Sequence, residues 1–442
     1  MFEEALRRAD IVFGNLTETD EGIITLGNGD MQAVLHREKD DIVIRLAKND
    51  IWDRRLDTSK DTPLISIDEL TEKILAEGDS FSDEIRKWIS EYPSYVDHVY
   101  PCPVLCAKIQ INMPESTNET HRLSLRKGAL YSCNLCMRID ANHNCFVLEN
   151  LTDDLKVSLI PANQIEMDAP ETGEFDGIQY ILQTLPEDID VPAWYFAVAF
   201  KRIGGSVCAS IATSQDKQTC LDEAMTCVKR FEKESFWNEH IRWWEEFWSV
   251  SGIELEDHFL ESPWYRSLYL LACACRPGKT VPGLYVGISK DQAPWHGDYH
   301  WDWNMQMTFW GCYAANHPDL CEPYDTIVLS LLKRAEWLAE KLYNVEGAFF
   351  PVTSFLGEPE DPATCKANNN RMSLVNDWGR MLGNAGFVVQ NLWRHYLFTH
   401  DRKLLEHIYP VLYKTAMFYL NYGKLYPSVS PEHWRNKQFL KT

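Results

Sequence analysis

The stretch CLDEAMTCVKRFEKESFWNEHIRWWEEFWSV, Cys220 to Val250, divides the chain into two kinds of structure. Its apolar residues recur at the 3.6-residue spacing of a helix, which is expected to end near Ser251-Gly252. Before about residue 215 apolar and polar residues alternate as in strands, whereas the helical period persists from Lys217 onward. The sequence therefore predicts a β domain followed by an all-helical domain.

Residues 1–215 contain many short alternating stretches separated by Gly, Asn, Asp and Pro. Because no regular helices lie between them, we predict an antiparallel β-sandwich, with one acidic helical excursion at about 67–91. The expected strands are Gly22–Leu26, Met31–Leu35, Ile42–Leu46, Val104–Met113, Ala129–Ile139, Cys145–Leu148, Leu155–Ile160, Ile178–Leu182, Trp194–Phe200 and Val207–Ile211.

The second half is predicted to be helical throughout, with a helical linker at 216–258 and further helices in 259–442. Helix stops are predicted at Arg276-Pro277-Gly278, at Asn316-His317-Pro318 and at Gly423. The helices are expected at Pro263–Cys275, Asn304–Asn316, Pro323–Tyr343, Met381–Thr399 and Leu404–Tyr422.

Composition excludes several classes of protein. The 442 residues carry 65 acidic and 43 basic side chains, and the net charge of −22 repels phosphate backbones and anionic lipid surfaces, so nucleic acid is not an expected partner. The longest apolar run, Leu268–Cys275, is far short of the ~18 residues of a membrane span, and the N-terminus lacks a signal-peptide pattern. These features leave localisation and oligomeric state open.

The thirteen cysteines favour reduced thiols over a disulfide framework, because their number is odd and they are spread along the chain. Cys102/Cys106 and Cys133/Cys136 resemble the close pairs of a zinc site. Cys133 and Cys136 fall in one predicted strand, however, where positions three apart face opposite sides. We therefore predict neither a metal nor a cofactor.

Thirteen of the 16 tryptophans lie in the helical half, and four of them are Trp295, Trp301, Trp303 and Trp310. Indole rings can stack on a flat ligand such as a sugar ring, or they can fill a core. Both interpretations stay open from composition alone.

Two segments carry the groups for chemistry. In the first, Ala293–Asn304, the proton-exchanging side chains of His296, Asp298, His300 and Asp302 are interleaved with three indoles, in a loop that leads into a predicted helix. Their spacing matches no metal motif. The position of the two histidines and Asp298 in the loop favours substrate hydrogen bonding. In the second, Tyr426–Trp434, Glu432 is either part of an ordinary helix start or a general acid whose pKa is raised among aromatic residues.

Several motifs resemble glycoside hydrolase family 95, the inverting α-L-fucosidases of the six-hairpin glycosidase superfamily. The matching stretches are Leu26–Val34, Asn49-Asp50-Ile51-Trp52, Arg276-Pro277-Gly278, Gly287-Ile288, Pro294-Trp295, Asp302–Met307, Phe309-Trp310, Gln390–Asp401 and Pro427–Glu432.

The resemblance implies an N-terminal β-sandwich, a helical linker and an (α/α)6 barrel, with Glu432 as the general acid. The family's paired asparagines, which orient the base and its water, fall on Asp302 and Asn304. From the residue types and their position in and near the Ala293–Asn304 loop, the candidate sugar-binding residues are Trp295, His296, Asp298, His300, Trp301, Trp303 and Trp310.

This sequence departs from the family pattern in two ways. The first asparagine of the pair is the carboxylate Asp302, and fewer than the twelve barrel helices precede Thr442, so the catalytic aspartate is expected beyond this chain. The implied function is an inverting hydrolase that removes terminal α-L-fucosyl or related α-L-galactosyl residues from oligo- or polysaccharides. Alternatives are Asp302 as the base, a sugar-binding pseudoenzyme without a base, and an assembly scaffold.

Overall fold

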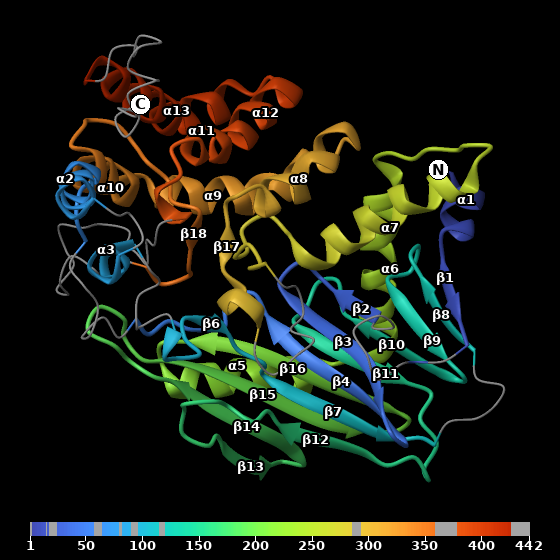
Figure 1. Ribbon diagram of the computed structural model, residues 1–442. Coiled ribbons are helices and arrows are strands. Elements are labelled where there is room, and N and C mark those ends of the chain that lie inside the picture. Colours follow the sequence, from blue (N-terminus) through green and yellow to red (C-terminus); the bar gives the residue numbers. More distant parts are fainter. Residues whose placement is uncertain are drawn as a thin grey trace.

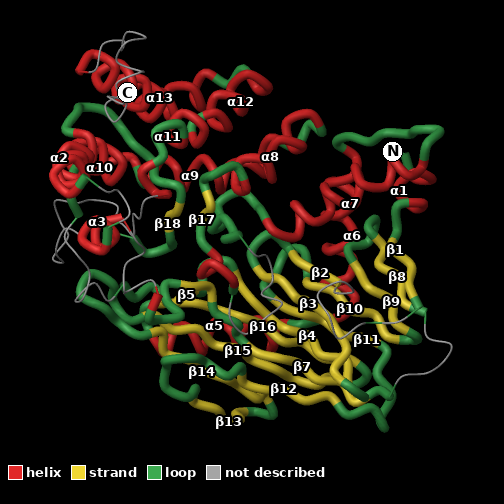
Figure 2. The backbone as a smooth tube through the Cα atoms, viewed as in Figure 1, coloured by secondary structure: helices red, strands yellow, loops and turns green. Residues whose placement is uncertain are grey.

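A computed structural model of the protein describes residues 2–14, 16, 24–56, 64–78, 82–89, 96–114, 120–284, 293–358 and 378–425. Strands occupy the lower part of the view in Figure 1 and most helices lie above them, which Figure 2 shows again by secondary structure. Antiparallel sheets followed by helices confirm the coarse organisation expected from the sequence.

The larger sheet has nine strands within the described residues, and all neighbours in it are antiparallel. In spatial order they are β1 (Ile11–Phe13), β8 (His121–Ser124), β9 (Ala129–Ser132), β10 (Leu135–Ile139), β11 (Cys145–Glu149), β16 (Ser206–Ser214), β15 (Trp194–Ile203), β14 (Ile178–Leu185) and β13 (Glu171–Phe175). The sequence did not predict β1, β8 or β13, which are three to five residues long.

The smaller sheet has five antiparallel strands in the described part of the chain. They are β12 (Val157–Pro161), β7 (Ala107–Asn112), β4 (Asp41–Lys48), β3 (Met31–Glu38) and β2 (Ile24–Gly27), and β5 (Trp52–Asp53) pairs separately with β6 (Cys102–Pro103). Ile44 of this sheet and Phe146 of the larger one lie in the same buried cluster, so the two sheets share a core.

The predicted strand Ala129–Ile139 is wrong, because the structure folds it into the hairpin of β9 and β10. Cys133 makes the turn with a left-handed φ of 52° and is exposed, while Cys136 is buried. Both arms keep the apolar alternation, so periodicity gave no sign of a turn that contains neither Gly nor Pro. Cys133 therefore lies in a turn and Cys136 in β10, and the two do not share one strand as predicted.

The helical excursion consists of two helices, α2 (Ile67–Glu77) and α3 (Asp83–Ile89). Ser66 and Glu69 form a capping box at the start of α2, and Gly78 ends it with a φ of 75°.

The helix expected over Cys220–Val250 is also two helices, α5 (Lys217–Arg230) and α6 (Lys233–Ser249). Glu232 separates them by accepting hydrogen bonds from the backbone N–H groups of Glu234 and Ser235, which caps α6. Helix α5 packs on β15 and β16 (Figure 1).

The helices after α6 follow the predicted positions, but two predicted helices are each divided in two and the last helix continues past the predicted stop at Gly423. The short helix at Glu3–Arg8 was not predicted from the sequence. The bounds are α1 (Glu3–Arg8), α7 (His258–Ala274), α8 (Asn304–Ala314), α9 (Glu322–Ser330), α10 (Leu332–Tyr343), α11 (Asn384–Val388), α12 (Gln390–Thr399) and α13 (Arg402–Leu425). Helix α12 packs on α8 and α13, and α10 packs on α13. None of the helices in the described ranges is long and apolar enough to cross a bilayer.

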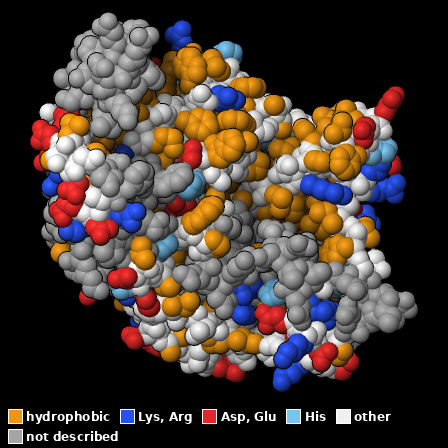
Figure 3. Space-filling model, viewed as in Figure 1, with side chains coloured by type: hydrophobic (Ala, Val, Ile, Leu, Met, Phe, Trp, Pro, Cys, Tyr) orange, Lys and Arg blue, Asp and Glu red, His pale blue; other side chains and the backbone are white. Residues whose placement is uncertain are grey.

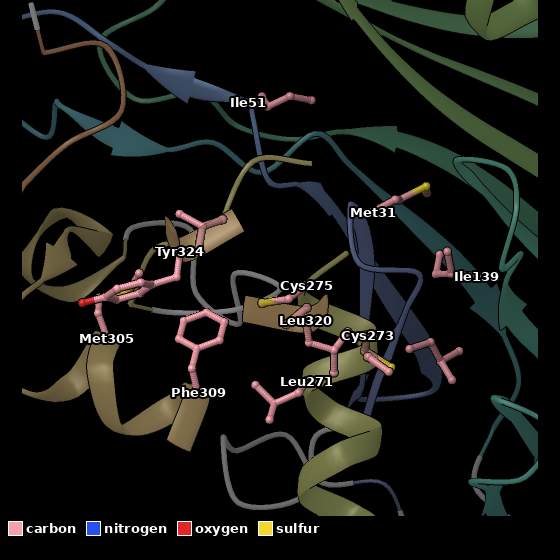
Figure 4. Packing of buried hydrophobic residues seen from close by; sticks show 14 of the residues in the cluster. Met31, Ile51, Ile139, Leu271, Cys273, Cys275, Met305, Phe309, Leu320 and Tyr324 are labelled. Carbon is pink, nitrogen blue, oxygen red and sulfur yellow. The ribbon is translucent and has the colours of Figure 1, made fainter. Parts of the chain in front are cut away.

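One hydrophobic core connects the sheets to the helices. Figure 4 shows Met31 and Ile139 of the sheets near Leu271, Cys273 and Cys275 of the α7 region, with Phe309, Leu320 and Tyr324 beyond them, and all belong to the same buried cluster. Helix α7 also contacts β2 and β3. On the surface, hydrophobic side chains gather over the upper part of the face in Figure 3, and exposed apolar side chains of α12 include Trp393, Leu397 and Phe398.

Candidate active site

The loop that enters α8 has an unusual backbone. Trp295, His296 and Gly297 have consecutive left-handed φ values of 50°, 56° and 59°, and Trp303, immediately before α8, has a φ of 68°. Left-handed conformations are unfavourable for residues with a Cβ, and strain of this kind concentrates at functional sites. We call residues 293–304 the aromatic loop.

A short strand inside the aromatic loop fixes its position. Strand β17 (Tyr299–His300) pairs with β18 (Thr353–Ser354), and the N–H of Trp301 donates to the carbonyl oxygen of Val352 over 2.6 Å. His296 is buried and donates from Nδ1 to the Pro101 carbonyl oxygen over 3.1 Å, so the β-rich half also supports the loop.

Asp298, His300 and Trp295 form the centre of the candidate site. Oδ2 of the buried Asp298 lies 3.1 Å from Nδ1 of His300. The Trp295 ring stacks on the imidazole with centroids 5.7 Å apart and an interplanar angle of 24°. Because Trp295 is 60% exposed, it offers a flat apolar surface to solvent.

The electrostatics of this pair favour a charged imidazole. Burial raises the pKa of Asp298, and the hydrogen bond to His300 opposes that rise. The pKa of His300 is raised by its hydrogen bond to Asp298 and by the negative charges of Asp298 and Asp302, against the effect of burial. His300 therefore keeps its proton to higher pH than a free histidine.

Asp302 and Asn304 lie at the entrance to α8, both half-buried, and the charge of Asp302 acts on His300. Trp303 between them is 57% exposed. Of the two predicted catalytic positions in this loop, Asp302 therefore acts electrostatically on the imidazole. The predicted general acid, Glu432, lies outside the described residues.

Two of the predicted sugar-binding tryptophans, Trp301 and Trp310, are held by contacts with other parts of the helical half. Trp301 is fully buried and meets Tyr324 edge to face at 5.6 Å, a position that favours core packing. Trp310 donates from Nε1 to the Asn391 side-chain oxygen over 3.0 Å and lies under the Arg394 guanidinium at 4.8 Å, so α12 holds it.

Sequence reasoning gave no role to Gln306 or Asn391, which support the aromatic loop through a chain of two hydrogen bonds. The Gln306 amide donates to the Trp301 carbonyl over 2.5 Å, and the Asn391 amide donates to the Gln306 carbonyl over 3.0 Å. Both side chains are fully buried. The available signal was an amide at a core-facing position of each helix, since such a group needs a buried partner.

Within the described ranges, no group of three or more His, Cys, Asp or Glu side chains is arranged to hold a metal ion. The groups present can stack on an apolar face, donate from an imidazole N–H and accept through carboxylates. Such a combination suits a ligand with many hydroxyl groups.

The aromatic loop lies in the helical half of the chain, between α7 and α8. Residues 249–440 match the model of the "Glycosyl hydrolase family 95 catalytic domain", so the resemblance is confirmed and this region is family-95-like. The region contains the aromatic loop.

Two curated relatives agree with this family. "Alpha-L-fucosidase 2" of Arabidopsis thaliana is 27% identical over 175 residues, which cover 37% of this chain and 20% of that protein. "Probable alpha-fucosidase A" of Aspergillus niger is 27% identical over 179 residues, which cover 37% of this chain and 21% of that protein. The matched part of the chain spans about a fifth of the length of each relative.

Proposed function

We propose that this chain carries the sugar-binding part of an inverting glycoside hydrolase that removes terminal α-L-fucosyl or related α-L-galactosyl residues from glycans. The single observation that carries the proposal is the exposed Trp295 stacked on His300, whose proton is held by the buried Asp298. The family match and the fucosidase relatives support the sugar class. In this proposal the helices belong to an (α/α)6 barrel, with 1–215 as a β-sandwich domain and 216–258 as a linker.

The proposed chemistry needs two carboxyl groups on opposite faces of the glycosidic bond. One protonates the departing oxygen while the other activates water, and roughly 6.5–9.5 Å between them leaves room for that water. We assign the acid to Glu432. Asn304 and Asp302 orient the base and its water, Trp295 stacks on the sugar ring, and the charged His300 donates to a sugar hydroxyl.

The test is hydrolysis of 2′-fucosyllactose followed by proton NMR. Inversion predicts that β-L-fucose appears before the anomers equilibrate, and Glu432→Gln is expected to lower kcat by at least about 100-fold. Initial release of α-L-fucose would contradict inversion. Calorimetric binding without any released fucose would favour the pseudoenzyme alternative.

A second variant addresses the base. If Asp302 only orients the water, as an asparagine does in the family pattern, Asp302→Asn retains hydrolysis. If Asp302 is the base, that variant loses at least about 100-fold in kcat. Equal folding of both proteins, checked by circular dichroism, makes the comparison valid.

A further inference from the structure

The segment 348–358 contains the strand that pairs with the aromatic loop, and we call it the support segment. It includes β18, which pairs with β17 through only two residue pairs, Tyr299 with Ser354 and His300 with Thr353. A two-stranded ladder of this length is not stable by itself in water. The position of His300 therefore depends on what holds the support segment.

Three helices hold the support segment along its length. At its start, the N–H of Ala348 donates to the Lys414 carbonyl in α13 over 2.9 Å. In the middle, the Asn384 amide at the start of α11 donates to the carbonyls of Phe350 and Pro351 over 3.2 and 2.7 Å. Its end is held by α10, through Arg334.

Arg334 is the charged side chain among the groups that hold the support segment. Its Nη1 donates to the Ser354 hydroxyl over 3.3 Å, and its guanidinium forms an ion pair with Glu358. Both side chains are 1% exposed. A buried ion pair of this kind adds little to stability compared with an apolar pair, but removal of one partner leaves an uncompensated charge. Stability alone therefore does not explain why charges occupy this place.

We propose that Arg334 and Glu358 are positioning residues that fix the backbone of the aromatic loop through Ser354 and β18. A guanidinium can hold the Glu358 carboxylate and the Ser354 hydroxyl at the same time in a fixed planar geometry, which an apolar pair cannot do. The effect that we expect on kcat rests on the proposed function.

The decisive variant is the double substitution Arg334→Met/Glu358→Met. Each single substitution is expected to lower Tm because it leaves a buried charge, whereas the double variant is expected to recover most of the loss. Despite that recovery, kcat for 2′-fucosyllactose is expected to stay about 10-fold lower with KM changed much less, because the loop is misplaced. Ser354→Ala removes only the hydroxyl contact and is expected to change kcat in the same direction by a smaller factor.

A readout without turnover is hydrogen exchange at the Trp301 amide, which donates to Val352 beside β18. We expect this amide to exchange at least about 10-fold faster in the double variant than in the wild type. Lys341→Met is the matched control, because it removes a positive charge at an exposed position of the same helix α10.

The outcomes separate the two proposals. A double variant with wild-type Tm, Trp301 exchange and kcat would show that the pair is only structural, which overturns the inference. Faster exchange at Trp301 in the double variant and not in Lys341→Met supports it. If the wild-type protein releases no fucose, the proposed function fails, while the exchange result still decides whether Arg334 and Glu358 hold the loop.

Discussion

Asp298 and His300 are the residues whose charges most directly define the candidate site. The hydrogen bond from His300 to Asp298 is the largest cause of the raised pKa of His300, and the charge of Asp302 is a smaller one. Because this pKa is raised in the folded state, the stabilisation from the charged imidazole is fully present below the unfolded pKa, and it is lost as the pH rises through the folded pKa.

We predict that Asp298→Asn moves the His300 titration to lower pH, since the amide cannot supply the negative charge. Asp302→Asn is expected to shift it in the same direction by less. NMR of the imidazole resonances as a function of pH measures both midpoints. A larger shift from Asp302→Asn than from Asp298→Asn would contradict the assignment of the main partner.

The residue types of this site were predictable, but their burial was not. His296, Asp298 and His300 stood out as polar groups in an aromatic loop. Their division into buried Asp298, half-buried His300 and exposed Trp295 depends on three left-handed residues and on pairing with β18, some fifty residues away in sequence. No local period encodes a contact of that range.

At the scale of elements, helices α9 and α12 are joined by one buried polar contact. Oδ2 of Asp325 in α9 lies 2.5 Å from Nδ1 of His395 in α12, and burial raises the pKa of the Asp325 carboxyl while His395 opposes the rise. Removal of the imidazole leaves this carboxyl without its partner in a buried position.

We predict that His395→Ala lowers the free energy of unfolding by about 2 kcal/mol. Asp325→Asn is expected to cost less, because the amide oxygen still accepts from Nδ1. Urea unfolding measures both values, and Lys403→Ala, an exposed position on α13, is the control with little expected change. A cost for His395→Ala no larger than that of the control would show that the contact adds nothing to helix packing.

The kind of each long element was predictable from periodicity, but its breaks were not. The breaks at Glu232, Leu331 and Val389 interrupt helices in which the apolar period continues on both sides and no Gly or Pro marks the junction. The break at Glu232 is visible only from its capping hydrogen bonds. The hairpin turn at Cys133 was missed for the same physical reason.

At the scale of the whole molecule, the backbone of the β-rich half lies directly against the backbone of α7. Gly27 in β2 lies against α7 so tightly that a Cβ there would be 2.3 Å from the Cys273 carbonyl oxygen, and the N–H of Gly29 donates to the same oxygen over 2.9 Å. Asn49 follows β4 and donates to the carbonyls of Gly29, Ala274 and Thr280 over 3.2, 2.9 and 2.8 Å. One buried amide therefore connects both sides of this contact.

We predict that Asn49→Ala destabilises the β-rich half and the helices together, by about 1–3 kcal/mol, because buried carbonyls lose their donor. Thermal unfolding followed by far-UV circular dichroism and by tryptophan fluorescence is the measurement, since 13 of the 16 tryptophans lie in the helical half. The two transitions are expected to coincide and to move to lower temperature together. Asn142→Ala, at an exposed turn of the β-rich half, is expected to leave both unchanged. Separate transitions, with only one of them moved by Asn49→Ala, would mean that the two halves unfold independently. The support of the aromatic loop by Pro101 would then not depend on the Asn49 hydrogen bonds.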